Sequence, residues 1–76
     1  MYELYVSETC PYSVKVMNYF NENNIPYVKK LVSDYANMEE LIDLGGMHQV
    51  PFLYDPDEGT KMYESNDIID YVSKRR

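Results

Sequence analysis

The sequence predicts an α/β fold in the order β-α-β-α-β-β-α, with one mixed four-stranded sheet and helices on both faces. A strand pattern, a helix pattern and a second strand pattern follow one another within about thirty residues, which predicts a right-handed βαβ unit. Two short strand patterns around a turn cluster predict a hairpin further on. The chain has 76 residues and no repeat or linker, so we expect one domain over residues 1–76.

The first strand and helix are indicated by alternation and by proline placement. Residues Tyr2–Val6 alternate and are rich in β-forming side chains, which predicts a strand. Pro11 stands where a helix begins, because the first helical position needs no N–H donor. Asn23, Asn24 and Pro26 predict the end of that helix. Apolar residues recur along it at roughly helical spacing: Val14, Met17, Tyr19 and Phe20.

Residues 27–32 complete the βαβ unit as its second strand, and residues 35–44 predict a second helix. Gly45 and Gly46 are expected to end this helix. Its start has several candidate caps: Asn37 with Glu40 in a capping box, or Ser33 or Asp34 one turn earlier.

The hairpin is predicted from residues 52–54 and Thr60–Tyr63, with a turn cluster at residues 55–59 between them. Ser65 is a good N-cap for a last helix over residues 66–74. The side chains of this helix expected to face inward are Ile68, Ile69 and Val72.

Composition and charge exclude several classes of function. One cysteine cannot form an internal disulfide, and with only one histidine the chain cannot build a cysteine-rich metal site. A net charge of −6 disfavours nucleic-acid binding. No apolar run approaches the ~20 residues of a membrane span, and the N-terminus lacks a signal-peptide pattern. We expect a cytoplasmic protein without metal that binds neither nucleic acid nor membrane.

Cys10 lies at the predicted junction of the first strand and the first helix. A helix N-terminus presents unpaired N–H groups and a partial positive charge, and both favour an anion. A thiolate placed there has a lowered pKa and is reactive at neutral pH. The alternative is that Cys10 is a small buried apolar residue. Its position beside Pro11, at a strand-to-helix junction, favours the reactive thiol.

Ser13 occupies the place of the second cysteine in a Cys-x-x-Cys motif, which beside a βαβ unit is typical of thioredoxin-like proteins. Without a resolving thiol, a mixed disulfide on Cys10 must wait for an external thiol. The Ser13 hydroxyl can donate a hydrogen bond to the Cys10 sulfur. An ordinary first-turn serine is an equally good interpretation of this residue.

Two further stretches can bind a peptide-like ligand. The bond between Val50 and Pro51 precedes a strand and is either cis or trans. In the cis form, the N–H and C=O of Val50 would face outward and could pair with an extended peptide. At the last helix, the N–H groups beside Ser65 could hold a carboxylate, although capping alone explains Ser65 and Asp67 equally well.

These elements, in this order, resemble the glutaredoxin family over nearly the whole chain. Residues 10–13 read Cys-Pro-Tyr-Ser, which matches the family's Cys-Pro-Tyr-Cys motif except in the last position. Residues 49–51 read Gln-Val-Pro and look like its Thr-Val-Pro loop. Residues 63–68 fall where the family has Gly-Gly-x-Asp-Asp/Glu-Leu, and they are similar to the Glu-Ser motif of the glutathione-transferase N-terminal domain. The resemblance implies a minimal thioredoxin-like fold.

The resemblance also implies a substrate: glutathione, or a protein that carries it as a mixed disulfide. Cys10 would attack the glutathione sulfur and release the protein thiol, and a second glutathione would regenerate Cys10. Val50 would pair its backbone with the cysteinyl unit. Ser65 and Asn66 would hold the γ-glutamyl carboxylate. The implied catalytic residues are Cys10 and Ser13, and the implied glutathione-binding residues are Tyr12, Gln49, Val50, Pro51, Glu64, Ser65 and Asn66.

The chain departs from the family pattern at three places. Ser7 replaces a lysine that pairs with the glycyl carboxylate in many glutaredoxins, so Lys15 or His48 would have to substitute for it. Residues 63 and 64 are Tyr-Glu in place of Gly-Gly. Ser13 replaces the second cysteine, either naturally, as in monothiol members, or as an engineered Cys→Ser change that traps the mixed disulfide.

Three functions remain as alternatives. The first is a monomeric, glutathione-dependent thiol–disulfide oxidoreductase that acts on glutathionylated proteins. The second is a dimer that carries a [2Fe–2S] cluster with two glutathiones, although residues 11 and 12, Pro-Tyr, are bulkier than the Gly-Phe usual in such carriers. The third is a transferase-like binding module. We place it last because the sequence ends at Arg76 without a second helical domain.

Overall fold

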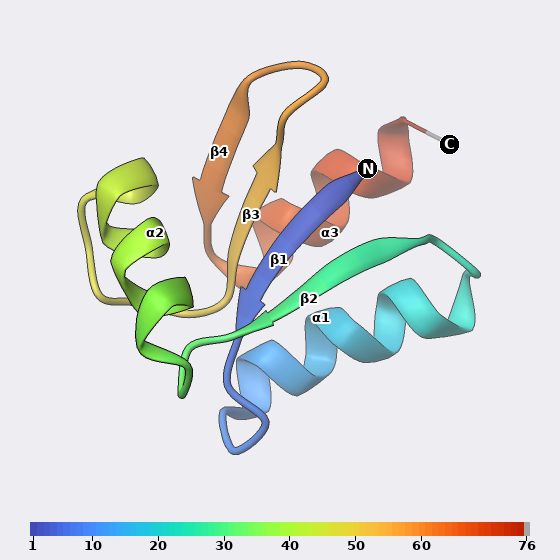
Figure 1. Ribbon diagram of the computed structural model, residues 1–76. Helices are drawn as coiled ribbons and strands as arrows, with labels where there is room; N and C mark the ends of the chain where they lie inside the picture. Colours follow the sequence, from blue (N-terminus) through green and yellow to red (C-terminus); the bar gives the residue numbers. More distant parts are fainter. Residues whose placement is uncertain (76) are drawn as a thin grey trace.

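A computed structural model describes residues 1–75 of the chain. The expected element order is confirmed, and the fold is thioredoxin-like (Figure 1). The seven elements are β1 (Tyr2–Val6), α1 (Pro11–Glu22), β2 (Tyr27–Leu31), α2 (Tyr35–Gly45), β3 (Phe52–Asp55), β4 (Thr60–Tyr63) and α3 (Ser65–Lys74).

The four strands form one mixed sheet in the order β2-β1-β3-β4. β1 runs parallel to β2, with Tyr2 opposite Tyr27, and antiparallel to β3, with Leu4 opposite Leu53. β3 and β4 form the antiparallel hairpin. The end of β1 therefore lies beside the start of β3, at one end of the sheet, and the loop after β1 and the loop before β3 both lie there.

The helices cover the two faces of this sheet, α2 on one side and α1 with α3 on the other (Figure 1). Successive side chains of a strand point to opposite faces, so β1 contributes to two cores. Leu4 and Val6 pack with α1 and α3, whereas Tyr5 packs with Phe52 and with Leu41 of α2. Among residues 1–75, no helix combines the length and apolar character that crossing a bilayer requires.

The buried side of α1 differs from the expectation at one position. Met17 and Phe20 are buried as expected, but Val14 is 36% exposed and Val16 takes its place in the core. A helix turns by about 100° per residue, so positions 13, 16, 17 and 20 share one face. Ser13 therefore lies on the buried side of the helix and is fully buried.

The start of α2 selects one of the candidate caps. Asp34 is the N-cap, and its Oδ1 accepts a hydrogen bond from the N–H of Ala36 at 2.9 Å. The helix ends at Gly45, and Gly46 follows with a φ of 87°, a left-handed conformation that glycine adopts without penalty.

The start of α3 corrects the expectation for Ser65. Ser65 is the first residue of the helix, and Glu64 is its N-cap. Glu64 has a φ of 73°, which turns the chain sharply from β4 into α3. Ser65 is thereby drawn inward and is buried, as are Ile68 and Val72, while Ile69 is partly buried against the same core. The remaining differences are small: β2 ends one residue early, and β3 extends to Asp55.

Candidate functional site

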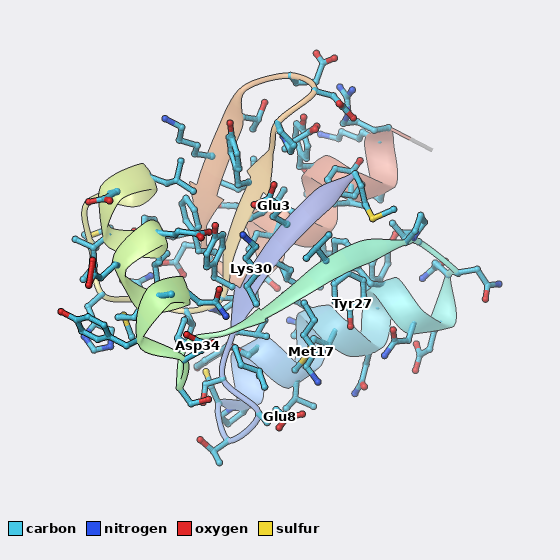
Figure 2. All side chains as sticks on the ribbon, viewed as in Figure 1. Glu3, Glu8, Met17, Tyr27, Lys30 and Asp34 are labelled. Carbon is cyan, nitrogen blue, oxygen red and sulfur yellow. The ribbon has the colours of Figure 1, made fainter. Side chains whose placement is uncertain are left out.

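Cys10 is the N-cap of α1 and follows a short loop from the end of β1. This loop is held to the neighbouring strand, because Lys29 donates from Nζ to Oε2 of Glu8 at 2.7 Å. Figure 2 labels Glu8 at this end of the molecule, beside the start of α1. The backbone N–H of Cys10 donates to the C=O of Ser7 at 3.2 Å. The thiol is partly exposed, so a reagent can reach it.

The surroundings of the Cys10 thiol favour its thiolate. Partial burial raises the pKa of Cys10, but hydrogen bonds from the Ser13 backbone and hydroxyl and from the Tyr12 backbone together outweigh that effect. The net pKa is lowered from the ordinary value for a thiol. The predicted direction is therefore confirmed, and the causes are the free N–H groups of the first helical turn together with one hydroxyl.

The Ser13 side chain is fully buried and has two hydrogen-bond partners. Its Oγ accepts a hydrogen bond from the backbone N–H of Ser7 at 3.2 Å and is a partner of the Cys10 sulfur. A hydroxyl can accept one hydrogen bond while donating another, so both contacts can exist at once. Ser13 is thus a bridge between the loop and the thiol, which an ordinary exposed first-turn serine would not be.

A pocket of about 550 Å³ lies at the same end of the sheet. Three segments build it: the start of α1, the loop before β3, and the junction of β4 with α3. Its lining contains all seven residues expected to bind glutathione, together with one that was not predicted: Tyr12, Gln49, Val50, Pro51, Glu64, Ser65, Asn66 and Asp67.

Val50 forms one wall of the pocket, and the bond between Val50 and Pro51 is cis. Among residues 1–75, no hydrogen bond joins the N–H or C=O of Val50 to another group. A backbone donor and acceptor on one residue at the rim of a pocket are what an extended peptide needs for strand-like pairing.

The opposite wall is the start of α3. The first intrahelical bond there is donated by the N–H of Ile68 to the C=O of Glu64, at 3.0 Å, so the N–H groups before it point toward the pocket end of the helix. Gln49 Nε2 donates to Glu64 Oε1 at 3.3 Å and joins the two walls. Lys15 Nζ donates to Asn66 Oδ1 at 2.7 Å, which ties α1 to α3.

The pocket does not include the residues considered as substitutes for the missing lysine. Lys15 is bound to Asn66, and neither it nor His48 lines the pocket. Asp67 was missed as a lining residue because its place in the first turn of a helix is explained by the helix dipole alone.

Comparison with known proteins gives the family. Residues 4–76 match the family "Glutathione S-transferase, N-terminal domain", and the chain belongs to this family. Glutaredoxin 2 of Escherichia coli (strain K12) is 38% identical to the chain over 73 residues, which are 95% of this chain and 33% of the relative. The chain therefore spans about one third of the length of the curated relatives it matches.

Two solved structures are similar to the chain in the same way. Glutaredoxin 2 from Salmonella typhimurium, solved in complex with glutathione, is 30% identical with a TM-score of 0.78, over 95% of this chain and 32% of that one. Glutathione transferase Omega 3C from Trametes versicolor is 27% identical with a TM-score of 0.84, over 97% of this chain and 33% of that one.

These matches refine the expected family. The resemblance to glutaredoxins is confirmed in the form of glutaredoxin 2, within the transferase N-terminal domain family. The family match keeps a transferase-like module as an alternative, because the position of Arg76 is no argument when the relatives are about three times as long. The matching relatives are glutaredoxins and glutathione transferases, which are enzymes that act with glutathione.

Proposed function

We propose that the protein is a glutathione-dependent thiol–disulfide oxidoreductase in which Cys10 removes glutathione from mixed disulfides by a monothiol mechanism. One observation carries the proposal: a partly exposed thiol with a lowered pKa stands at the helix start that also supplies Tyr12 to the pocket. A nucleophile and a peptide-sized pocket at one end of the sheet fit a reaction on a glutathionyl group.

The reaction has two exchange steps. The Cys10 thiolate attacks the glutathione sulfur of a protein–glutathione disulfide, so that a new disulfide forms between Cys10 and glutathione while the substrate thiolate leaves and takes up a proton. The thiolate of a second glutathione then attacks the glutathione sulfur bound to Cys10. Oxidised glutathione leaves, and Cys10 returns as a thiolate, so electrons and atoms balance over the cycle.

The pocket would hold the glutathione part of each disulfide. The free N–H and C=O of Val50 would pair with the backbone of the cysteinyl unit, which brings its sulfur toward Cys10. The N–H groups at the start of α3, at Ser65 and Asn66, would bind the γ-glutamyl carboxylate. Asp67 lines the same end and would face the ammonium of that unit.

Ser13 limits the chemistry to glutathione exchange. A serine cannot attack the disulfide on Cys10, so release depends on an external thiol. The hydrogen bond from its hydroxyl to the sulfur would still stabilise the Cys10 thiolate, both when it attacks in the first step and when it leaves in the second. We therefore propose efficient removal of glutathione and weak reduction of protein disulfides, with glutathionylated proteins as the partners of a monomeric chain in the cytoplasm.

The test is the rate at which glutathione is removed from a glutathionylated peptide in the presence of excess glutathione. Wild type is expected to accelerate the reaction, and Cys10→Ser to abolish the acceleration. Lys74→Met, which alters an exposed residue of α3, is the control and should react like wild type. An equal rate with wild type and Cys10→Ser would overturn the proposal. Conjugation of glutathione to an electrophile, measured alongside, tests a transferase activity in place of the exchange.

A further inference from the structure

Tyr63 ends β4 and places its side chain on the α2 face of the sheet. Its ring packs against that of buried Phe52, with centroids 4.7 Å apart. Its hydroxyl donates to the C=O of Met47 at 2.8 Å and accepts from the N–H of Met47 at 3.1 Å. One side chain therefore satisfies both backbone groups of a single residue in the loop between α2 and β3.

This contact is the main hydrogen-bonded anchor of that loop. Within residues 1–75, the backbone groups of residues 47–50 make hydrogen bonds only through the Tyr63 hydroxyl. Gln49 and Val50, which form one wall of the pocket, follow Met47 directly in this segment. The opposite wall begins with Glu64, the residue after Tyr63. Tyr63 thus lies between the two walls and is bonded to both, covalently to one and by hydrogen bonds to the other.

Gly45 makes room for this arrangement. A Cβ on Gly45 would lie 2.8 Å from Cζ of Tyr63 and 2.9 Å from Cε1 of Phe52, which is closer than such atoms approach. The end of α2 therefore admits the tyrosine ring only because residue 45 has no side chain. The rings of Tyr63 and Phe52 therefore pack directly against the backbone of Gly45, where the loop leaves α2.

We propose that the Tyr63 hydroxyl is a positioning group for the pocket: it fixes the Val50 backbone at the spacing from the start of α3 that glutathione requires. This inference rests on the proposed function for the identity of the ligand. The hydroxyl does not touch the reacting atoms, so it acts on binding and not on the thiol. Its loss is expected to weaken binding of the glutathionyl substrate while the reactivity of Cys10 stays unchanged.

The test compares Tyr63→Phe with wild type, because phenylalanine keeps the ring against Phe52 and removes only the hydroxyl. The KM for a glutathionylated peptide is expected to rise roughly threefold to tenfold, the effect of losing about one net hydrogen bond. The rate at which iodoacetamide alkylates Cys10 should remain that of wild type. Tyr71→Phe is the matched control, since its hydroxyl donates to buried Asp55 at 2.8 Å at the turn end of the hairpin.

Amide hydrogen exchange of Gly46 and Met47, whose N–H groups are hydrogen-bonded, provides a second readout that needs no glutathione. Exchange is expected to be faster in Tyr63→Phe and unchanged in Tyr71→Phe. An unchanged KM in Tyr63→Phe, or an equal rise in Tyr71→Phe, would overturn the inference. So would unchanged exchange of the loop. If wild type neither binds nor uses glutathione, the proposed function fails, and the exchange experiment alone decides whether Tyr63 holds the loop.

Discussion

The hydroxyl of Ser13 accepts a hydrogen bond from the backbone N–H of Ser7 at 3.2 Å and is also a hydrogen-bond partner of the Cys10 sulfur. One buried side chain thus couples the loop after β1 to the thiol at the start of α1. The loop cannot shift without disturbing a group that lowers the pKa of Cys10. The serine in place of the second cysteine therefore has a structural role in addition to any role in exchange.

Ser13→Ala is expected to raise the pKa of Cys10, because the variant loses a hydrogen bond that favours the thiolate while the burial that disfavours it remains. The measurement is the pH dependence of the alkylation rate of Cys10, whose midpoint should move to higher pH. Ser73→Ala is the control, since the Ser73 hydroxyl donates to the C=O of Asp70 at the far end of α3. A midpoint that stays in place in Ser13→Ala would show that the hydroxyl does not reach the thiol.

The folded chain is expected to react faster at Cys10 than the unfolded chain near neutral pH. The pKa of the folded thiol is lowered, whereas an unfolded thiol has a pKa of about 8.5. Between these two values only the folded chain carries a thiolate, and below both neither does. Toward acid pH both rates should therefore fall in parallel until their difference is small, and above about pH 9, where both thiols are ionised, the advantage of the folded chain should disappear. Alkylation rates with and without urea measure it, and a higher midpoint in the folded chain would contradict the account.

Glu40 on α2 is expected to contribute stability that depends on pH. It accepts hydrogen bonds from Lys30 at 2.6 Å and from the buried Tyr5 hydroxyl at 2.9 Å. Glu3 forms an ion pair with the same lysine, and Figure 2 labels Glu3 and Lys30 beside each other on the sheet. The hydrogen bond from Lys30 and then that from Tyr5 lower the pKa of Glu40.

A carboxyl group whose pKa is lowered by folding stabilises the fold at pH values above its unfolded pKa of about 4.3. This stabilisation is lost as the pH falls through its folded pKa. In Glu40→Gln, the free energy of unfolding should therefore fall less between pH 6 and pH 3 than in wild type. Urea unfolding at both pH values measures the difference. Glu39→Gln, one position away on the same helix, is the control. Equal losses in Glu40→Gln and wild type would contradict the assignment.

Gly45→Ala is expected to destabilise the protein. Alanine in place of glycine inside a helix normally stabilises it by about 0.5–1 kcal/mol. Here the added Cβ would meet the rings of Tyr63 and Phe52, and such overpacking costs about 1–3 kcal/mol. The sign of the change in unfolding free energy thus reports whether Tyr63 occupies the space beside α2, and a stabilised Gly45→Ala would show that it does not.

Local patterns were sufficient to predict most of the fold. Alternation predicts β1, and the position of Pro11 predicts the start of α1. Both signals depend only on residues that are adjacent in the sequence. The pocket residues were found through motifs whose members lie on three separate segments, and the fold brings those segments to one end of the sheet.

The remaining features depend on contacts between residues distant in the sequence. Ser65 has the right chemistry for an N-cap, yet Glu64 is the N-cap, because the turn out of β4 places a positive φ at residue 64. Nothing near Tyr63 in the sequence indicates that its hydroxyl reaches Met47, or that Gly45 leaves space for its ring. Such pairs become visible only when α2 and β4 are placed side by side.

The most direct test of the account is mass spectrometry of the intact protein after incubation with oxidised glutathione. Cys10 is expected to gain one glutathionyl group, located at that residue by peptide mapping and removed by added glutathione. A pocket variant, Asp67→Asn, loses the carboxylate proposed to face the ammonium of the γ-glutamyl unit and should form the adduct more slowly although its thiol is unchanged. A wild-type chain that stays unmodified, or that reacts at the same rate as the pocket variant, would contradict the claim that Cys10 and the pocket form one glutathione site.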